Sequence, residues 1–438
     1  MATGINVSQL SEFNPIELAD IKQVVAERFW TAPEFNKIFS VYGGYDKKTQ
    51  LVLADELGLS GILDSGGARP ESGGLGITLS EKFVNTVLIG DTKKHTQIDF
   101  NKDFKMVVRK SAKDYTELSE TDQLAIYMTE KVLTYMSEAR YRLAMLGDTA
   151  ADLNSAGGNL VNTYSIGGVT YTNNKKLFNS INGVWKQAKT GVAASKTPRA
   201  TIAENYAYSK VLQLSITDAH AFAAIKAVYD NAENDLKGNP NAFILATPSV
   251  YNGYKNYLMA NTLSGGGLSQ LTIDGVATPA YAGIPIYEDQ KTQNTIVKYT
   301  NVSPATALNG ATTATAYTSI TVDSTVGFPE AGKITIGAGG TGKVFENTSI
   351  TATTFVGSSQ TMAVNADDSV VELVADLYDL PHRVIMATAE NLGCYTLDEN
   401  DLNNLESFYD KVTRVNYFAY DFLIDVVIGR EELLSVAY

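Results

Sequence analysis

Cysteine and histidine are scarce in this chain of 438 residues, which contains one cysteine and three histidines. A single cysteine, Cys394, cannot form an intrachain disulfide or a zinc site built from cysteines. The histidines, His95, His220 and His382, lie far apart and show no short spacing typical of metal ligands. These shortages exclude a disulfide scaffold and a zinc ribbon.

Basic charge and long apolar runs are also in short supply. Lys and Arg number 35 against 48 Asp and Glu, a net charge of -13, which argues against a protein that grips nucleic acid by its phosphates. No run approaches the roughly 20 apolar residues that span a bilayer, and the first residues lack a basic segment followed by an apolar one. We therefore expect a soluble protein, made in a cytoplasm and without a membrane partner.

Catalytic motifs are missing or incomplete. The run Gly337–Lys343 resembles a phosphate-binding P-loop, but Val344 stands where a Ser or Thr should bind Mg²⁺, and the next residues favour a strand. We interpret it as a hairpin loop. Asp398–Asp401 lacks the central glycine of a calcium loop, and Cys394 has no basic neighbour in the sequence. The sequence predicts no enzyme, no cofactor and no metal site.

Glycine is abundant in one place, residues 58–76, after an N-terminal arm with an expected helix at 14–29. Two strand-like runs follow at 77–90 and 95–108, with Gly90 and Asp91 at the expected turn. Together they predict a long two-stranded β arm. Such an arm is marginal alone in water, so we expect it to lie on another surface.

The strongest single element is a helix predicted from about Ser119 to Leu146, with Gly147 at its end. One stripe at helical spacing contains Leu124, Met128, Val132, Tyr135, Met136, Ala139, Leu143 and Leu146. At 1.5 Å per residue, the helix is expected to be roughly 40 Å long.

Helices and short strands alternate afterwards. We expect helices at 217–236 and from Pro248, and strands at 242–247 and 283–288, which together indicate a mixed α/β unit. Residues 301–370 are rich in Thr, Ser, Gly and Val and predict a small all-β module. The expected C-terminal elements are a long strand at 369–380, a strand from Val384, and a central strand at 414–429.

This order of elements resembles the major capsid proteins of tailed bacteriophages with the HK97 fold. The passage AFILATPSVYNGYKNYLMANT, followed by a glycine-rich loop and YAGIPIYED, looks like recurrent sequence of that family's A-domain. The run TATAYTSITVDSTVGFPEAGKITIG is similar to small β modules of phage structural proteins. The resemblance implies an α+β, HK97-like capsid fold with an inserted all-β domain.

The resemblance also implies a domain plan. It comprises an N-terminal arm at 1–56, an E-loop hairpin at 57–112, a P-domain with a spine helix at 113–215, an A-domain at 216–300, the inserted module at 301–370, and a return to the A- and P-domains at 371–438.

The expected function is a major capsid protein that assembles into hexamers and pentamers and forms an icosahedral shell. Its implied partners are other copies of itself, portal, scaffold and head-decoration proteins, and enclosed double-stranded DNA bound without sequence specificity; its place is the virion, after assembly in the bacterial cytoplasm. The alternatives are an encapsulin-type compartment shell, a phage tail or baseplate component, and a carbohydrate-binding structural protein.

The candidate contacts between subunits lie in the arm and its flanks, where lysines are dense in an otherwise acidic chain. A solvated basic face is the alternative interpretation of these lysines. The candidates are Gly66, Gly67, Gly73, Gly74, Lys93, Lys94, Lys102, Lys105, Arg109, Trp30 and Phe35.

Overall fold

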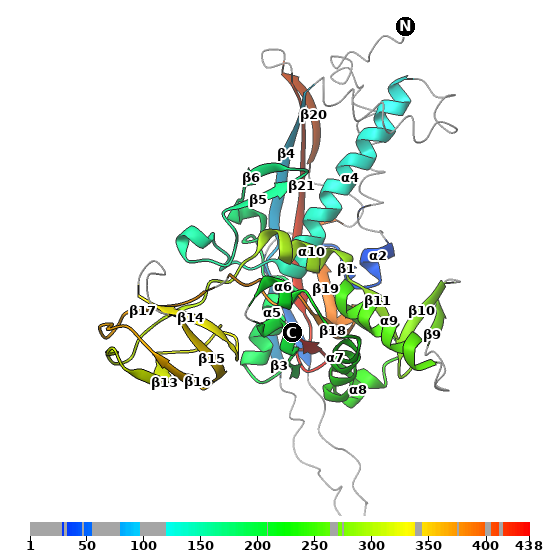
Figure 1. The fold of residues 1–438 in the computed structure, drawn as a ribbon. Helices are drawn as coiled ribbons and strands as arrows, with labels where there is room; N and C mark the ends of the chain where they lie inside the picture. Colours follow the sequence, from blue (N-terminus) through cyan, green and yellow to red (C-terminus); the bar gives the residue numbers. More distant parts are fainter. Residues whose placement is uncertain are drawn as a thin grey trace, which may run out of the picture. The chain divides into compact units, whose positions relative to one another are not determined.

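The structure is a computed structural model that divides into two compact units (Figure 1). Unit 1 comprises Met1–Ala144 and Ala389–Gly429, and unit 2 comprises Met145–Thr388 and Arg430–Tyr438. The expected α+β class is confirmed, whereas the six domain boundaries remain a prediction. The structure describes residues 29, 33–45, 48–54, 79–96, 120–207, 209–262, 270–273, 276–337, 344–374, 376–398, 404–410 and 415–438.

A long central strand organises unit 1. Strand β21 (Val415–Ile428) pairs antiparallel with three strands, which confirms the expected central strand at 414–429. Its aromatic and β-branched residues suit such a position, because both faces and both edges of the strand are in contact with neighbours. The sheet also contains β1 (Ser40–Tyr42), β4 (Val87–Thr96), β19 (Leu392–Tyr395) and β20 (Asn404–Asp410).

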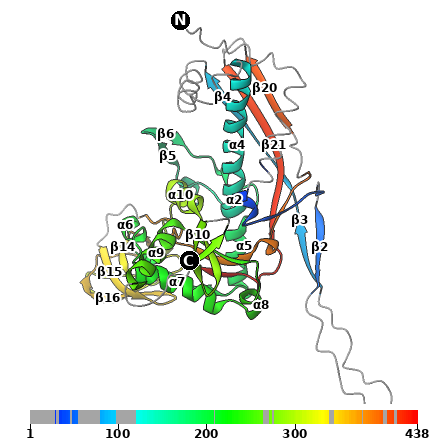
Figure 2. The same cartoon turned by 90° about the vertical axis from the view of Figure 1, so that its right-hand side faces the viewer.

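The helix α4 (Glu120–Leu146) confirms the expected spine helix and ends immediately before Gly147. In its described C-terminal half, Met136, Ala139 and Leu143 are buried, as the apolar stripe predicts. In both views the unit 1 part of α4 runs beside β21 and β4 (Figures 1 and 2). The expected helix at 14–29 lies outside the described residues, except for Phe29.

The predicted turn at Gly90 and Asp91 is wrong. Strand β4 runs straight through both residues and pairs with β21, while β3 (Leu79–Val84) pairs with β2 (Thr49–Ala54). Gly90 permits a close approach instead, because a Cβ atom there would displace the Asp421 carboxylate on the neighbouring strand. The rest of the predicted second strand, 97–108, and the glycine-rich segment 58–76 lie outside the described residues.

Unit 2 contains a seven-stranded mixed sheet in the order β7-β22-β18-β8-β11-β10-β9. The expected strands at 242–247 and 283–288 and the helix from Pro248 are confirmed. The strands are β7 (Arg199–Ala200), β8 (Ala242–Ala246), β9 (Gln270–Ile273), β10 (Val276–Tyr281), β11 (Ile284–Glu288), β18 (Val384–Thr388) and β22 (Ser435–Ala437).

Two helices, α7 (Asp218–Asn231) and α9 (Pro248–Thr262), pack on this sheet and on each other. Gly253 allows the close contact between the helices, since a Cβ there would lie 2.7 Å from the Cβ of Ala221. The expected single helix at 217–236 is wrong, because Ala232 and Glu233 are extended and separate α7 from α8 (Asn234–Lys237).

The all-β module is confirmed as a six-stranded antiparallel sheet with its own core, which includes Phe328, Phe345 and Phe355. The expected long strand at 369–380 is wrong: β17 ends at Leu373 and belongs to the module. The strands are β12 (Ala305–Ala307), β13 (Ala316–Thr321), β14 (Gly332–Ile336), β15 (Val344–Ile350), β16 (Thr354–Thr361) and β17 (Val370–Leu373).

The remaining elements are helices, short 3-10 turns and the paired strands β5 and β6. They are α2 (Pro33–Asn36), η2 (Asn154–Ala156), β5 (Thr163–Ile166), β6 (Val169–Thr172), η3 (Lys175–Leu177), α5 (Val184–Ala193), η4 (Ala203–Tyr206), α6 (Lys210–Gln213), α10 (Gln290–Tyr299) and η6 (Ala389–Asn391).

Candidate functional site

Most of the expected contact residues fall outside the described part of the chain: Gly66, Gly67, Gly73, Gly74, Lys102, Lys105, Arg109 and Trp30. The backbones of Lys93 and Lys94 are described, in β4 opposite Phe418 and Tyr417 of β21. Phe35 is 3% exposed in the single chain, which leaves its ring almost no surface for a neighbouring subunit.

Phe35 packs instead against a buried arginine of α4. The Arg140 guanidinium lies 3.8 Å from the centre of the Phe35 ring and 4.1 Å from that of Phe29, and it donates to the Phe29 carbonyl. A guanidinium between two aromatic faces gains from both its charge and its contact area. The cluster therefore fastens the end of the N-terminal arm to α4 within unit 1.

Cys394 in β19 lies near the same arginine, although the sequence shows no basic neighbour. Burial raises the pKa of the Cys394 thiol to about 12, and the charge of Arg140 opposes this rise only in part. The thiol is fully buried and stays protonated at neutral pH, although the fold brings a basic residue near it that the sequence does not show.

Strands β2 and β3 form a two-stranded arm, and β3 continues through a short joint into β4. On this strand arm Phe83 is 49% exposed, and the Lys48 ammonium lies 4.3 Å from its ring centre. Leu88, the second residue of β4, is 55% exposed. Two large apolar side chains five residues apart thus face solvent at the base of the arm.

A buried carboxylate holds the joint between β3 and β4. Asp425 of β21 accepts hydrogen bonds from the backbone N–H of Asn85 at 2.7 Å and of Val426 at 2.8 Å, and Asp425 is only 9% exposed. Burial raises the pKa of the Asp425 carboxyl to about 6, and these two hydrogen bonds counteract part of the rise. An ionised carboxylate here costs stability at neutral pH.

Acidification from pH 7 to pH 5 is therefore expected to stabilise unit 1. The folded pKa of about 6 exceeds the ordinary value of 3.8, so the folded chain binds this proton more tightly, and stability rises as the pH falls through 6 towards 4. The gain between pH 7 and pH 5 is about 1 kcal/mol, and it reaches about 3 kcal/mol only below pH 4. Hydrogen exchange of the amides of β4 and β21 measures it, and Asp425→Asn should flatten the pH dependence. If the stability of the wild type and that of Asp425→Asn changed with pH in the same way, Asp425 would not be the group that titrates.

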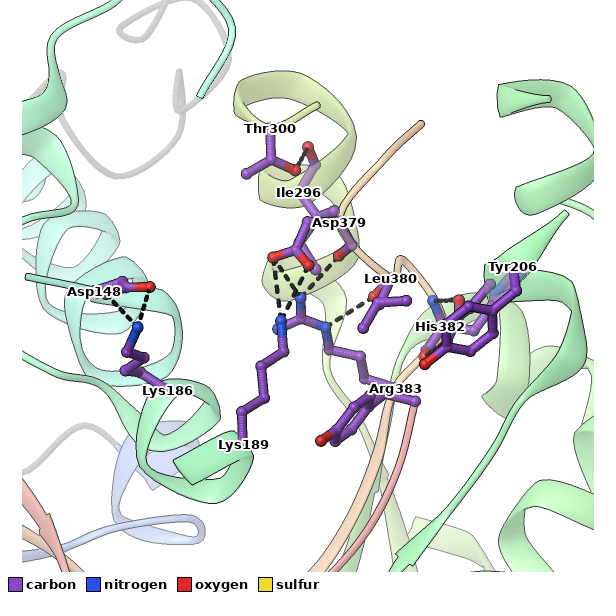
Figure 3. A network of polar contacts seen from close by, with 12 residues as sticks. Asp148, Lys186, Lys189, Tyr206, Ile296, Thr300, Asp379, Leu380, His382 and Arg383 are labelled. Atoms are coloured by element: carbon purple, nitrogen blue, oxygen red, sulfur yellow. Dashed lines mark hydrogen bonds and ion pairs between the residues drawn. The ribbon is translucent and has the colours of Figure 1, made fainter. Parts of the chain in front are cut away.

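Unit 2 contains a different feature, a buried ion network around Asp379 (Figure 3). Lys189 of α5 donates to the two carboxylate oxygens of Asp379 at 3.0 and 3.4 Å, and Arg383 donates from Nη2 to the same carboxylate at 3.2 Å. Arg383 is 1% exposed and lies with its guanidinium 5.0 Å from the centre of the Trp185 ring. The Asp379 carboxylate therefore forms ion pairs with both Lys189 and Arg383.

A tight turn just before β18 aims carbonyl groups at Arg383. Leu380 has φ +47°, a left-handed conformation that few residues other than glycine adopt, and Pro381 follows it. The turn lets Arg383 donate to the carbonyls of Asp379 and Leu380, both at 2.8 Å. Strain at Leu380 is thus offset by charge-assisted hydrogen bonds.

The charges in this network are mutually dependent. Burial alone would raise the pKa of Asp379, but the charges and hydrogen bonds of Lys189 and Arg383 outweigh it and hold the pKa at about 2. Burial lowers the pKa of Lys189, and the adjacent Arg383 charge adds to this, while Asp379 opposes both effects. A second pair, Lys186 with Asp148 at 3.0 Å, lies beside the network (Figure 3).

The other sites considered from the sequence have structural roles. The run Gly337–Lys343 joins β14 to β15, which pair antiparallel, so the hairpin interpretation is correct and no helix follows for a phosphate. Buried His382 is hydrogen-bonded to Ser249 Oγ at 2.6 Å, and burial lowers the pKa of His382 to about 4. Exposed His220 contacts Glu204. His95 lies in β4 opposite Asn416. Most of the segment Asp398–Asp401 lies outside the described residues.

No group of three or more His, Cys, Asp or Glu that could hold a metal ion occurs among the residues that the structure describes. Within the same ranges, no helix has the length and apolar character needed to cross a membrane. The ion network around Asp379 was not anticipated from the sequence, because Lys189 and Asp379 are separated by 190 residues.

Comparison with known proteins gave matches only among solved structures. No family model matches the chain, and no curated protein matches it. The procapsid of satellite phage P4, including its size determination (Sid) protein, aligns with a TM-score of 0.40 and 9% identity over 93% of this chain and 96% of that chain. The holo-SrpI encapsulin complex of Synechococcus elongatus aligns at 0.39 and 7% over 100% and 90%, and the capsid of cyanophage P-SCSP1u at 0.39 and 11% over 91% and 86%.

Proposed function

We propose that this chain is the major capsid protein of a tailed bacteriophage and that it assembles into hexamers and pentamers of an icosahedral shell. The observation that carries the proposal is the exposure of Phe83 on the strand arm and of Leu88 just beyond it, in a unit that also contains a long helix and a long central strand. The order of elements from β1 to β22 agrees with the resemblance found in the sequence.

The logic of a shell explains an uncovered arm. A two-stranded ribbon gains little from its own contacts, but it buries apolar surface when it lies on a neighbouring subunit. Repeated contacts that close into rings use the same patch in every copy, and many weak contacts made together give high avidity. Lys93 and Lys94 of β4, with Lys102, Lys105 and Arg109 further along the sequence, supply positive charge for contacts between subunits, in a chain of net charge -13.

The glycines and Trp30 complete the proposed contact set. Gly66, Gly67, Gly73 and Gly74 permit backbone conformations that differ between ring positions, and Trp30 follows the anchored Phe29. The remaining parts of the proposal are a virion location after assembly in the bacterial cytoplasm, enclosed double-stranded DNA without sequence-specific contacts, and portal, scaffold and head-decoration proteins as partners. The acidic balance of the chain agrees with weak adhesion to packaged DNA.

Electron microscopy of the expressed full chain, alone and with the scaffold protein of its phage, tests this function. Capsomers, sheets or shells are expected, and a persistent compact monomer under both conditions would overturn the proposal. Packaged DNA beside a portal protein distinguishes a phage head from an encapsulin, which would enclose an enzyme.

A double substitution, Phe83→Ser with Leu88→Ser, is expected to block assembly while the subunit stays folded. Each side chain is about half exposed, so burying the rest contributes about 1 kcal/mol per residue. Losing both raises the critical concentration for assembly about 30-fold. Light scattering against concentration measures it. The matched control is Val326→Ser with Val364→Ser, which removes apolar surface that is 85% and 73% exposed in the β module. If both double substitutions raised the critical concentration equally, the proposed contact through Phe83 and Leu88 would be contradicted.

A further inference from the structure

A cavity of about 50 Å³ adjoins the ion network of unit 2. Its apolar wall includes Leu160, Phe178 and Ile296, and its polar wall includes Lys189, Asp379 and Arg383. The Lys189 side chain, which lines the cavity, is 31% exposed to solvent. A water-sized group needs about 10–15 Å³ of such space, which leaves room for about four of them.

The ion pairs at this cavity are unequal. Lys186 pairs with Asp148, but Lys189 and Arg383 share the carboxylate of Asp379. The charge of Asp289 also favours the charged form of Arg383, which is 1% exposed, but less than that of Asp379 does. Buried charge is costly unless a counter-charge accompanies it.

Two hydrogen-bond donors at the cavity are also unused. The indole N–H of Trp185, which is 3% exposed, has no acceptor among the residues that the structure describes. Arg383 uses Nε and Nη2 for its bonds to residues 379 and 380, and its Nη1 donates to no acceptor in the described ranges. Both residues line the cavity.

We infer that this cavity binds a small oxyanion, of the phosphate or carboxylate class, between Lys189, Arg383 and the indole N–H of Trp185. The anion adds a second counter-charge to the two cations that share Asp379, and the Nη1 of the planar guanidinium suits an oxygen acceptor. A bound anion connects α5 to the turn before β18 and so stabilises unit 2. This site is independent of the proposed shell function.

The test is thermal unfolding of the full chain at pH 7 in sodium phosphate against sodium chloride at equal ionic strength. Phosphate is expected to raise the melting temperature in a saturable way, and at ten times its dissociation constant the folded-to-unfolded ratio rises about 11-fold. The same measurement in sodium sulfate and in sodium acetate identifies which oxyanion the cavity binds. If the melting temperature in phosphate, sulfate and acetate were the same as in chloride, the proposed site would be overturned.

Variants distinguish binding from general stabilisation. Lys189→Met removes one of the two cations and is expected to weaken binding at least tenfold. Trp185→Phe keeps one aromatic ring but removes the N–H with the pyrrole part of the indole, and it is expected to weaken binding several-fold. Asp379→Asn removes the competing carboxylate and is expected to strengthen binding, although it lowers stability. The control Lys175→Met breaks an exposed ion pair with Asp152 in the same unit and leaves the phosphate effect unchanged. An unchanged phosphate effect in Lys189→Met would also overturn the site.

Discussion

Replacing Phe355 with alanine is expected to unfold the β module while the seven-stranded sheet of unit 2 stays folded. Phe355 is fully buried, and its ring meets that of Phe328 edge to face with centres 5.0 Å apart. Removing a buried phenylalanine ring costs about 3–5 kcal/mol. The core of the β module lies within Ala305–Leu373, and a core of this size contributes about 3–5 kcal/mol to the free energy of unfolding. One substitution can therefore unfold the module.

Hydrogen exchange and limited proteolysis measure this outcome. Amides of β13–β16 are expected to lose protection in Phe355→Ala, while those of β8 and β18 keep it. Val326→Ala is the control, because Val326 belongs to the same module and is 85% exposed. Loss of protection in β8 as well would show that the module and the sheet unfold together.

Replacing Asp379 with alanine is expected to cost about 3 kcal/mol, because Lys189 and Arg383 then face each other without a counter-charge. The estimate is at the lower end of such losses, since the Asp379 and Lys189 side chains are 21% and 31% exposed. Urea unfolding of unit 2 followed by tryptophan fluorescence measures it, with Trp185 beside Arg383 as the reporter.

The same substitution carries a pH signature of opposite sign to that of Asp425. The pKa of Asp379 is about 2, below the ordinary value of 3.8, so its ionised form contributes stability above about pH 4. That contribution, about 2 kcal/mol, is lost as the pH falls from 4 towards 2. The stability gap between wild type and Asp379→Ala is therefore expected to narrow over this range. A gap that stays constant would argue against the ion network.

Local patterns in the sequence were sufficient for elements that fold from nearby residues. The spine helix follows from apolar residues at helical spacing, which is a property of one segment, and Met136, Ala139 and Leu143 are buried as expected. The β module follows likewise from its composition and its closely spaced turns.

Pairing between distant segments was beyond the same reasoning. Gly90 looked like a turn residue, whereas it permits close packing against Asp421, which lies more than 300 residues away in the chain. The break between α7 and α8 was missed because Ala232 and Glu233 are ordinary helix formers that become extended only in the folded unit. The ion network joins Lys189 of α5 to Asp379 in the turn before β18, 190 residues away, so no local motif in the sequence predicts it.

The pairing of β12 with β17 bears on how this chain has changed over time. Ala305 lies opposite Glu372, and just outside the module Val302 bridges Leu377, so the chain enters and leaves the module at one point. Every strand of the module pairs within its own sheet. A single recombination event could therefore gain, exchange or delete the module without altering the order of the seven-stranded sheet, which makes it the part of the chain most open to evolutionary replacement.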